Sequence, residues 1–170
     1  RHVKKPLVVM APKSLLRHPM AISTPEAFYE GGFQKLIPAT ANPSTAKRLV
    51  FCSGKVYYDL VQQLDKAGKQ DEVAVARIEQ LYPFPEAEVR AELERYSDAE
   101  TVLWMQEEPA NMGSWQHVRY QLDDLLEALR GDCTHRVGYA GRAAAASTSV
   151  GHSKIHKIQQ QALLNEAMGV

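Results

Sequence analysis

The stretch Gln106–Trp115, QEEPANMGSW, sets two carboxylates side by side directly after an apolar run. Two carboxylates can act as general acid and general base if both reach the reacting atoms of one substrate. Neighbours in an extended chain point to opposite faces, so Glu107 and Glu108 do not converge in this way. One of them, at the carboxyl end of a parallel strand, stays a candidate functional group, but the pattern favours a structural role in fixing the loop.

Two further patterns resemble binding motifs without completing them. His152 and His156 are four residues apart, as in HExxH zinc sites, but Ser153 stands where the glutamate belongs and no third ligand follows. A solvated helix face is favoured over a metal site. Cys52–Lys55, CSGK, puts one glycine at a strand-to-helix turn, where backbone amides can hold an anion. The stretch is far from a phosphate-binding loop, and a tight turn is favoured.

Lys13, Arg17 and His18 form a basic cluster in PKSLLRHP. If a short helix covers Ser14–Arg17, then Lys13 and Arg17 lie on the same side, which suits a phosphate. Solvated charges or surface salt bridges are the more ordinary interpretation. The chain contains no GxSxG, no GxGxxG and no cysteine-rich zinc pattern, so no motif completes a catalytic site.

The bulk composition predicts an ordinary globular domain. Of the 170 residues 45% are hydrophobic, and 20 basic residues balance 20 acidic ones, so no overall pull toward nucleic acid or an acidic membrane exists. Cys52 and Cys133 form no disulfide framework, which favours a reducing compartment and thiols that pack. No apolar run approaches the roughly 20 residues that span a bilayer, and we expect a soluble chain. It begins without methionine, like a piece of a longer protein.

The first part of the chain is predicted to be irregular. Residues 7–11, between Pro6 and Pro12, have the composition of a buried strand. Prolines and paired glycines then exclude long helices between Lys13 and Lys47, although TPEAFYE allows one or two helical turns. We therefore expect residues 1–47 to be an entry strand followed by an irregular excursion loop.

From residue 48 onward strands and helices alternate. Strands are predicted at 48–53, 72–81, 101–106 and 134–141, helices at 56–67, 83–96 and 115–129, and a terminal helix lined by Ile155, Ile158 and Ala162. The tract RAAAASTSVG between the last strand and helix is predicted to be a loop. This alternation predicts an α/β core at 48–170, a mostly parallel sheet with helices on both faces, within a single domain spanning 1–170.

Five phrases in this order and at these intervals carry a family resemblance: PLVVMAPKSLLRHP, FCSGKVYYDL, RIEQLYPFP, QEEPANMGSW and YAGR. Over essentially its whole length the chain resembles the carboxyl-terminal domain of the decarboxylating first component of 2-oxoglutarate dehydrogenase, bacterial members above all. The resemblance implies a transketolase C-terminal fold, a three-layer α/β/α sandwich around a mixed five-stranded sheet. It also implies that the chain is a fragment of a longer multidomain enzyme.

The family uses thiamine diphosphate and magnesium to decarboxylate 2-oxoglutarate and passes the succinyl group to a lipoyl arm of the second component, within the tricarboxylic acid cycle. Its cofactor lies between the two preceding domains, and its diphosphate motif begins Gly-Asp-Gly. Here Gly131 and Asp132 are followed by Cys133. The resemblance therefore implies a domain that neither binds the cofactor nor catalyses, but completes a homodimeric enzyme in the bacterial cytoplasm, or in the mitochondrial matrix of a eukaryote.

Some family members bind AMP or acetyl-CoA at the junction of this domain with its predecessors. By this resemblance Lys13 and Arg17 are candidate nucleotide contacts, and the candidates for an interface loop are Glu107, Glu108, Asn111 and Trp115. The tract after YAGR departs from relatives, because alanine and serine replace common prolines and loosen the loop.

Three other interpretations stay open. The chain is a free-standing nucleotide-binding module with Lys13 and Arg17 as its anion site, or an autonomous enzyme that uses Glu107 or Glu108. The third is the same domain from a 2-oxoadipate-type dehydrogenase, since the residues that select the substrate lie outside this chain.

Overall fold

The computed structural model describes residues 4–6, 8–131 and 134–170, and the chain divides into two compact units, residues 1–33 and 34–170. The smaller unit contains a 3₁₀ helix, η1 (Lys13–Arg17), and a short α-helix, α1 (Glu26–Tyr29), as the sequence TPEAFYE allows. The predicted strand at 7–11 is wrong: residues 8–11 are irregular and exposed, and Leu7 lies outside the described residues. A strand needs a hydrogen-bonded neighbour, and no strand occurs in the described part of this unit.

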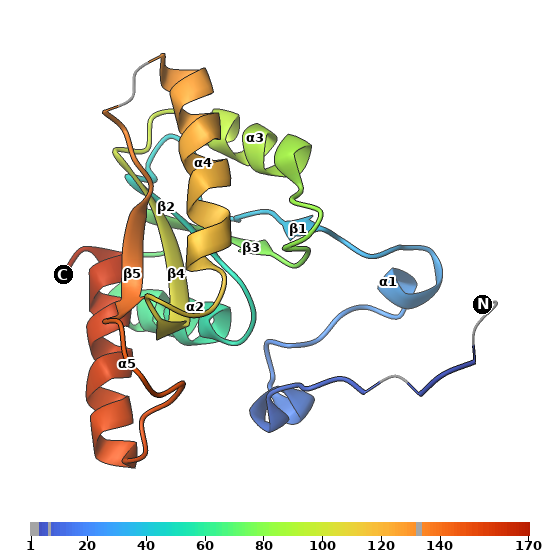
Figure 1. Cartoon of the computed structure of the whole chain (residues 1–170). Coiled ribbons are helices and arrows are strands. Elements are labelled where there is room, and N and C mark those ends of the chain that lie inside the picture. The colour runs from blue at the N-terminus through green and yellow to red at the C-terminus, as the bar shows by residue number, and fades with distance from the viewer. Residues whose placement is uncertain (1–3, 7, 132–133) are drawn as a thin grey trace. The chain divides into compact units, whose positions relative to one another are not determined.

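The larger unit is built on one mixed five-stranded sheet (Figure 1). Its strands, in spatial order, are β1 (Leu36–Ile37), β3 (Val73–Ile78), β2 (Arg48–Cys52), β4 (Thr101–Pro109) and β5 (Gly138–Arg142). β1 is antiparallel to β3 and the other pairs are parallel. The four strands predicted after residue 48 are confirmed. The fifth is a two-residue edge strand inside the excursion loop, too short to show a periodic pattern.

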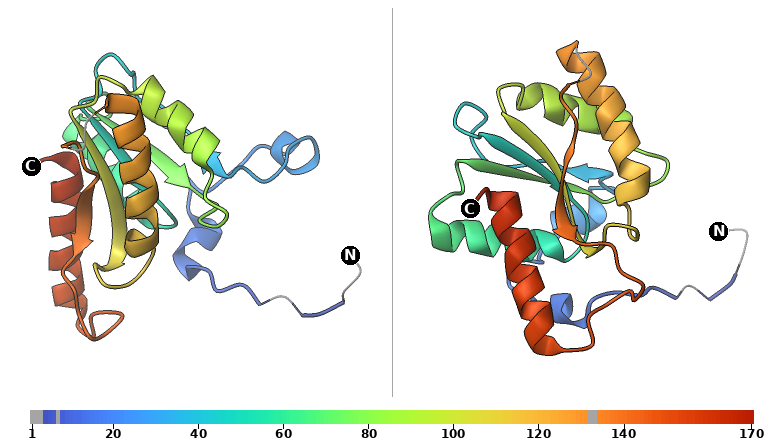
Figure 2. Two further views of the ribbon diagram at one scale, coloured as in Figure 1. Left: turned by 45° about the horizontal axis from the view of Figure 1, so that its top comes forward. Right: turned by 60° about the vertical axis from the view of Figure 1, so that its left-hand side comes forward.

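Four helices cover the sheet, α2 (Val56–Ala67), α3 (Glu86–Arg95), α4 (Trp115–Arg130) and α5 (Ser153–Met168). α2 and α5 pack together on one face and α3 and α4 on the other, as Figures 1 and 2 show. The expected three-layer sandwich is therefore confirmed. Gly68 ends α2 with a φ of 65°, a left-handed conformation that favours glycine.

Strand β2 shows why both faces of the sheet are dry. Leu49 and Phe51 point into the layer beneath α3 and α4, whereas Val50 and Cys52 point into the layer beneath α2 and α5. A central parallel strand is covered on both faces, which explains its continuous apolar run. Burial raises the pKa of the Cys52 thiol to about 12, so this cysteine packs as an apolar side chain, as expected.

Two predicted features of the last third need correction. Strand β5 begins only at Gly138, because the amide of Val137 donates to the Asp123 carboxylate on α4 (2.8 Å) instead of joining the sheet. Ile155 and Ile158 are exposed on α5, as is the neighbouring Ala162. The buried residues of this helix are Leu163, Leu164, Ala167 and Met168. The first turns of α5 extend past the end of the sheet, where there is no core to pack against (Figure 1).

Among the described residues, no helix has the length and apolar character needed to cross a membrane.

Candidate functional site at the carboxyl edge of the sheet

The carboxyl ends of the four parallel strands meet at one edge of the sheet, which we call the carboxyl edge. The chain leaves β2 toward the face covered by α2 and leaves the neighbouring β4 toward the face covered by α4. In open parallel sheets, ligands bind where the connections diverge in this way. The polar side chains at this edge are therefore the candidates for a functional site.

Lys55 lies in the turn after β2 and is neutralised by two carboxylates. Its Nζ is 2.6 Å from Asp59 Oδ2 and 3.0 Å from Glu107 Oε1. Partial burial opposes the lysine charge, but the bonds to Asp59 and Glu107 outweigh it, so the pKa of Lys55 lies above its usual value. Gly54 adopts the left-handed φ of 74° that the tight turn requires. With its cation paired, the CSGK turn is not an open anion site.

Glu107 and Glu108 do not form an acid and base pair. The side chain of Glu107, 24% exposed, pairs with Lys55, whereas Glu108 is exposed one position further along β4. The Glu108 main-chain oxygen lies 3.2 Å from the hydroxyl of Tyr139 on β5. Burial raises the pKa of Tyr139, which keeps this hydroxyl a donor. The two glutamates thus occupy opposite faces, as strand alternation predicts.

Gln106, which sequence reasoning passed over, organises the start of the loop between β4 and α4. Its side chain is buried, and Oε1 accepts hydrogen bonds from the Trp104 indole (2.9 Å) and from the amides of Ser114 (3.1 Å) and Trp115 (2.9 Å). The last two are orphan donors at the amino end of α4. One side-chain oxygen therefore joins the strand to the helix that follows it.

The amide nitrogen of Gln106 holds the loop from the other side. Nε2 donates to the carbonyl of Met112 (2.7 Å) and lies 3.2 Å from the carbonyl oxygens of Glu108 and Pro109. The only available signal was a polar residue at the end of an apolar strand, which does not say whether its side chain is buried. The unusual stretch QEEPANMGSW is consequently folded around its first residue.

Asn111 and Trp115 attach this loop to its neighbours. The Asn111 amide exchanges two hydrogen bonds of 3.0 Å with the backbone of Ala145, in the tract after β5. The half-buried Trp115 ring lies with its centroid 5.0 Å from that of Tyr139. Both predicted loop candidates therefore make contacts within this unit. Their role at an interface with other domains stays a prediction.

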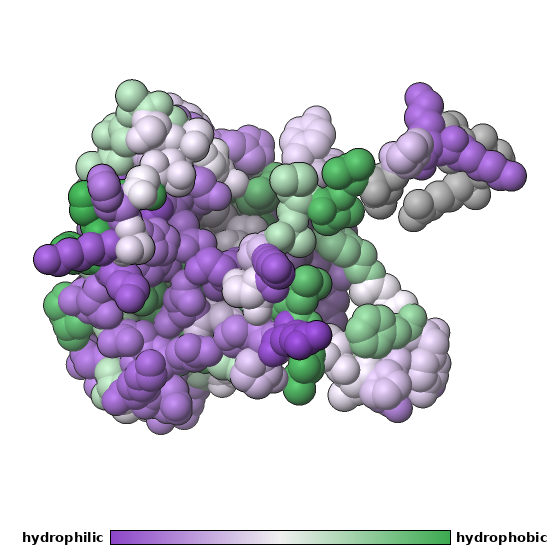
Figure 3. Space-filling view, turned by 90° about the horizontal axis from the view of Figure 1, so that it is seen from below, coloured by the Kyte–Doolittle hydropathy of each residue, from purple (hydrophilic) through white to green (hydrophobic). Residues whose placement is uncertain are grey.

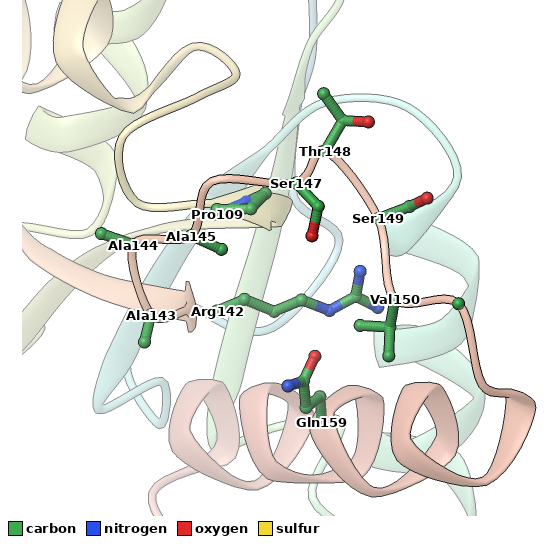
Figure 4. Close-up of a pocket in the computed structure, with 11 residues that line it drawn as sticks. Pro109, Arg142, Ala143, Ala144, Ala145, Ser147, Thr148, Ser149, Val150 and Gln159 are labelled. Atoms are coloured by element: carbon green, nitrogen blue, oxygen red, sulfur yellow. The ribbon is translucent and has the colours of Figure 1, made fainter.

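A pocket of about 320 Å³ opens beside this loop, between the end of β5 and α5 (Figure 4). It is lined by Pro109, Arg142, Gln159 and most of the loop 143–151. Nη2 of Arg142 lies 3.0 Å from both Gln160 Oε1 and His156 Nδ1 on α5. Sequence reasoning used YAGR as a family phrase and ended the predicted strand at Gly141, so it did not single out Arg142. The signal that could have found this pocket is an arginine at the carboxyl end of a parallel strand.

His152 and His156 are not arranged together as metal ligands. His152 precedes the helix and is exposed, while His156 Nδ1 faces the guanidinium of Arg142. A nitrogen that accepts from a guanidinium has no lone pair left for a metal. Among residues 4–6, 8–131 and 134–170 no group of three or more histidine, cysteine or acidic side chains is placed to hold a metal ion.

Lys13 and Arg17 lie in the smaller unit, and both are exposed. The helix that carries them is 3₁₀ rather than α. Three residues complete a 3₁₀ turn, so side chains four apart are rotated by about 120° instead of stacking. The expected alignment of the two cations is therefore not found, although their flexible side chains leave the nucleotide prediction open.

Comparison with known proteins places these features in context. The family model described as 2-oxoglutarate dehydrogenase C-terminal matches residues 22–168. The 2-oxoglutarate dehydrogenase E1 component of Haemophilus influenzae is 41% identical over 170 residues, which are 99% of this chain and 18% of the relative. The 2-oxoglutarate dehydrogenase E1 component of Azotobacter vinelandii is 42% identical over 172 residues, covering 100% of this chain and 18% of the relative.

Animal relatives match equally well. The mitochondrial 2-oxoglutarate dehydrogenase of Caenorhabditis elegans is 45% identical over 172 residues, which are 98% of this chain and 16% of that protein. The chain thus spans less than a fifth of the length of these relatives.

Proposed function

The chain belongs to the 2-oxoglutarate dehydrogenase C-terminal family, and from this we propose that it is a non-catalytic structural and regulatory domain of a longer dehydrogenase. The membership confirms the resemblance read from the sequence. The proposed parent decarboxylates 2-oxoglutarate and transfers the succinyl group to the lipoyl arm of a second component. Residues 1–170 are its single carboxyl-terminal domain in this proposal, and the parent is a homodimer.

The arrangement of the carboxyl edge is the observation that carries this proposal. At this edge, where such folds keep reactive groups, Lys55 is held between Asp59 and Glu107. Gln106 is buried and bonded to the Trp104 indole and to backbone groups. Glu107 pairs with Lys55, whereas Glu108 is exposed, so the two adjacent glutamates do not act on one point. These groups stabilise a loop rather than perform proton transfer.

We propose that the parent binds thiamine diphosphate outside this chain. The magnesium ion that bridges the diphosphate needs oxygen ligands, and the described residues contain no group of three histidine, cysteine or acidic side chains placed to hold a metal ion. Asp132 and Cys133, which follow Gly131, lie outside the described residues. We place the cofactor in parts of the parent that precede this chain.

Exposed apolar side chains support a role at interfaces with the rest of the parent. Of the fourteen large apolar side chains exposed among the described residues, nine belong to the smaller unit, including Val8, Met10 and Phe28, each at least 80% exposed. By contrast, hydrophilic side chains cover most of the larger unit on the face that Figure 3 shows. Clusters of exposed apolar residues mark surfaces that bury themselves against a partner.

The proposal predicts that the isolated 170 residues release no carbon dioxide from 2-oxoglutarate when supplied with thiamine diphosphate and magnesium. Near-ultraviolet circular dichroism of the buried Trp104 verifies that this preparation is folded, and the intact parent is the positive control. Turnover by the isolated chain contradicts the non-catalytic role. An intact parent that accepts 2-oxoadipate but not 2-oxoglutarate contradicts the substrate and favours the alternative dehydrogenase.

Regulation by a nucleotide is the second part of the proposal. Lys13 and Arg17 are exposed cations that take part in no ion pair with the described residues, which leaves them available to a phosphate of AMP or acetyl-CoA. Calorimetry on the intact parent is expected to show binding that Arg17→Ala weakens and that Lys154→Ala, an exposed cation on α5, does not. Equal binding by all three proteins contradicts this assignment.

A further inference from the structure

Three cations lie at the carboxyl edge, and their partners differ. Arg77, near the end of β3, has its Nε 2.8 Å from Glu79 Oε1. Lys55 is paired with both Glu107 and Asp59. Arg142, at the end of β5, forms no ion pair with any carboxylate of residues 4–6, 8–131 and 134–170. Within the described structure, its charge is the one at this edge that no acid balances.

The hydrogen bonds of Arg142 orient the guanidinium without neutralising it. Nη2 donates to Gln160 Oε1 and lies 3.0 Å from His156 Nδ1, neither of which is a carboxylate, and Gln160 is held in turn by its 2.9 Å bond to Asp59. Nε is buried without a partner, and the two bonds that orient the guanidinium both come from Nη2. A guanidinium has five N–H donors. The two N–H donors on Nη1 are therefore available to an acceptor from a bound ligand.

The pocket around Arg142 has the size and lining of a small-ligand site. In Figure 4 the arginine side chain runs between the loop and α5, and the Ser147 hydroxyl points toward it. Alanines and Val150 form apolar walls, and Gln159 Oε1, buried and without a partner, lines the same pocket. A volume of about 320 Å³ lies at the lower end of the range of ligand sites.

The pocket wall is tied down despite its sequence. The loop 143–151 consists of alanine, serine, threonine, valine and glycine, without the prolines that would stiffen it. Asn111 holds the first part of the loop through the paired bonds to Ala145. Because Asn111 belongs to the loop after β4, one side chain ties that loop to the wall of the pocket.

From these observations we propose that the pocket binds a small organic anion through Arg142. Carboxylate or phosphate oxygens accept hydrogen bonds from Nη1 of Arg142, and the Ser147 hydroxyl donates a further bond. Charge-assisted bonds from a guanidinium to either group are among the strongest in proteins. The site is built from residues of the larger unit, whereas Lys13 and Arg17 belong to the smaller one.

Hydrogen–deuterium exchange on the intact parent tests the site where it lies. Inorganic phosphate and citrate are added separately at matched ionic strength, and exchange is followed in the peptide covering residues 143–151. We expect one or both anions to slow exchange in this peptide. Arg142→Gln is expected to weaken the response roughly tenfold to a hundredfold in anion concentration, whereas Lys154→Gln, which removes an exposed charge outside the pocket, leaves it unchanged.

Two milder variants keep the test decisive if Arg142→Gln unfolds. Ser147→Val leaves every bond of Arg142 intact and is expected to weaken the response roughly twofold to tenfold. Asn111→Ala loosens the pocket wall without changing any charge and is expected to weaken it as well. A response to citrate alone identifies a carboxylate ligand, and a response to phosphate alone identifies a phosphorylated one. No response to either anion, or a response of wild-type strength in both the Arg142 and the Ser147 variants, overturns the proposal.

Discussion

Gln106 concentrates more hydrogen bonds than any other single side chain discussed above, and it is buried while doing so. We expect Gln106→Leu, which keeps the volume, to lower the free energy of unfolding by about 3 kcal/mol or more. The substitution leaves the Trp104 indole and the amides of Ser114 and Trp115 without their acceptor, and unsatisfied buried donors lower the free energy of unfolding. Urea unfolding followed by tryptophan fluorescence measures the change.

Gln116 provides the matched control, because it is also a glutamine near the start of α4 but is exposed and makes one bond, to the carbonyl of Ala110 (3.2 Å). Gln116→Leu is expected to change the free energy of unfolding by no more than about 0.5 kcal/mol. Equal effects of the two substitutions would show that the Gln106 network does not stabilise the fold.

Helix α3 anchors the irregular segment that precedes β2. Tyr96, which follows the helix, donates its hydroxyl proton to the Ala41 carbonyl (2.7 Å), and the buried Glu92 accepts from the amide of Ala39 (2.7 Å). Arg95 adds a bond to the Ala39 carbonyl (2.9 Å). The segment at residues 39–41, which the sequence predicts to be irregular, is therefore held by three side chains at the carboxyl end of α3.

Removing one of these contacts tests the anchor. Tyr96→Phe is expected to lower the free energy of unfolding by about 1 kcal/mol, because a buried hydrogen bond is lost without a change in packing. Tyr120→Phe serves as the control, since that hydroxyl is exposed and only accepts a bond from Arg119 (2.8 Å). If both variants have the same melting temperature as the wild type, the anchoring role of Tyr96 is refuted.

The elements that the sequence predicted correctly are those whose burial is periodic. Helix α4 shows helical spacing because a core lies on its inner face, and strand β2 shows a short continuous apolar run because a core lies on each of its faces. The segment 7–11 has a similar composition, but residues 8–11 form no strand with any described residue, so composition alone gave a wrong prediction. β1 was missed because two residues carry no period, and its place depends on pairing with β3.

The site was less predictable than the fold for a related reason. Glu107 and Asn111 stand out in the sequence, and alternation alone placed Glu107 and Glu108 on opposite faces. Arg142 is a candidate because no carboxylate among the described residues pairs with its charge. Gln106 is important because its side chain is buried. Both properties arise from contacts between segments that are distant in the chain, which no local pattern reports.

The division into two units predicts that they differ in what they contribute to stability. None of the described residues in 1–33 is buried, whereas the larger unit contains both hydrophobic cores. We expect deletion of residues 1–33 to change the free energy of unfolding of residues 34–170 by no more than about 1 kcal/mol. Urea unfolding of the shortened chain, with its sheet signal in far-ultraviolet circular dichroism, measures this.

Truncation at the other end is the control for that deletion. Removing residues 163–170 takes away Leu163, Leu164, Ala167 and Met168, all buried against the sheet. This variant is expected to lose its cooperative transition. If the chain without residues 1–33 also unfolds non-cooperatively, residues 34–170 do not fold stably without residues 1–33, and the prediction is contradicted.

The polar side chains of the carboxyl edge also form a continuous series, from Glu107 through Lys55, Asp59 and Gln160 to Arg142. Asp59 Oδ2 accepts from both Lys55 and Gln160, and Gln160 uses its two ends on Asp59 and Arg142. Each inner member therefore has a partner on either side. The series spans the edge from the last strand of the sheet to the turn after β2 through side chains alone.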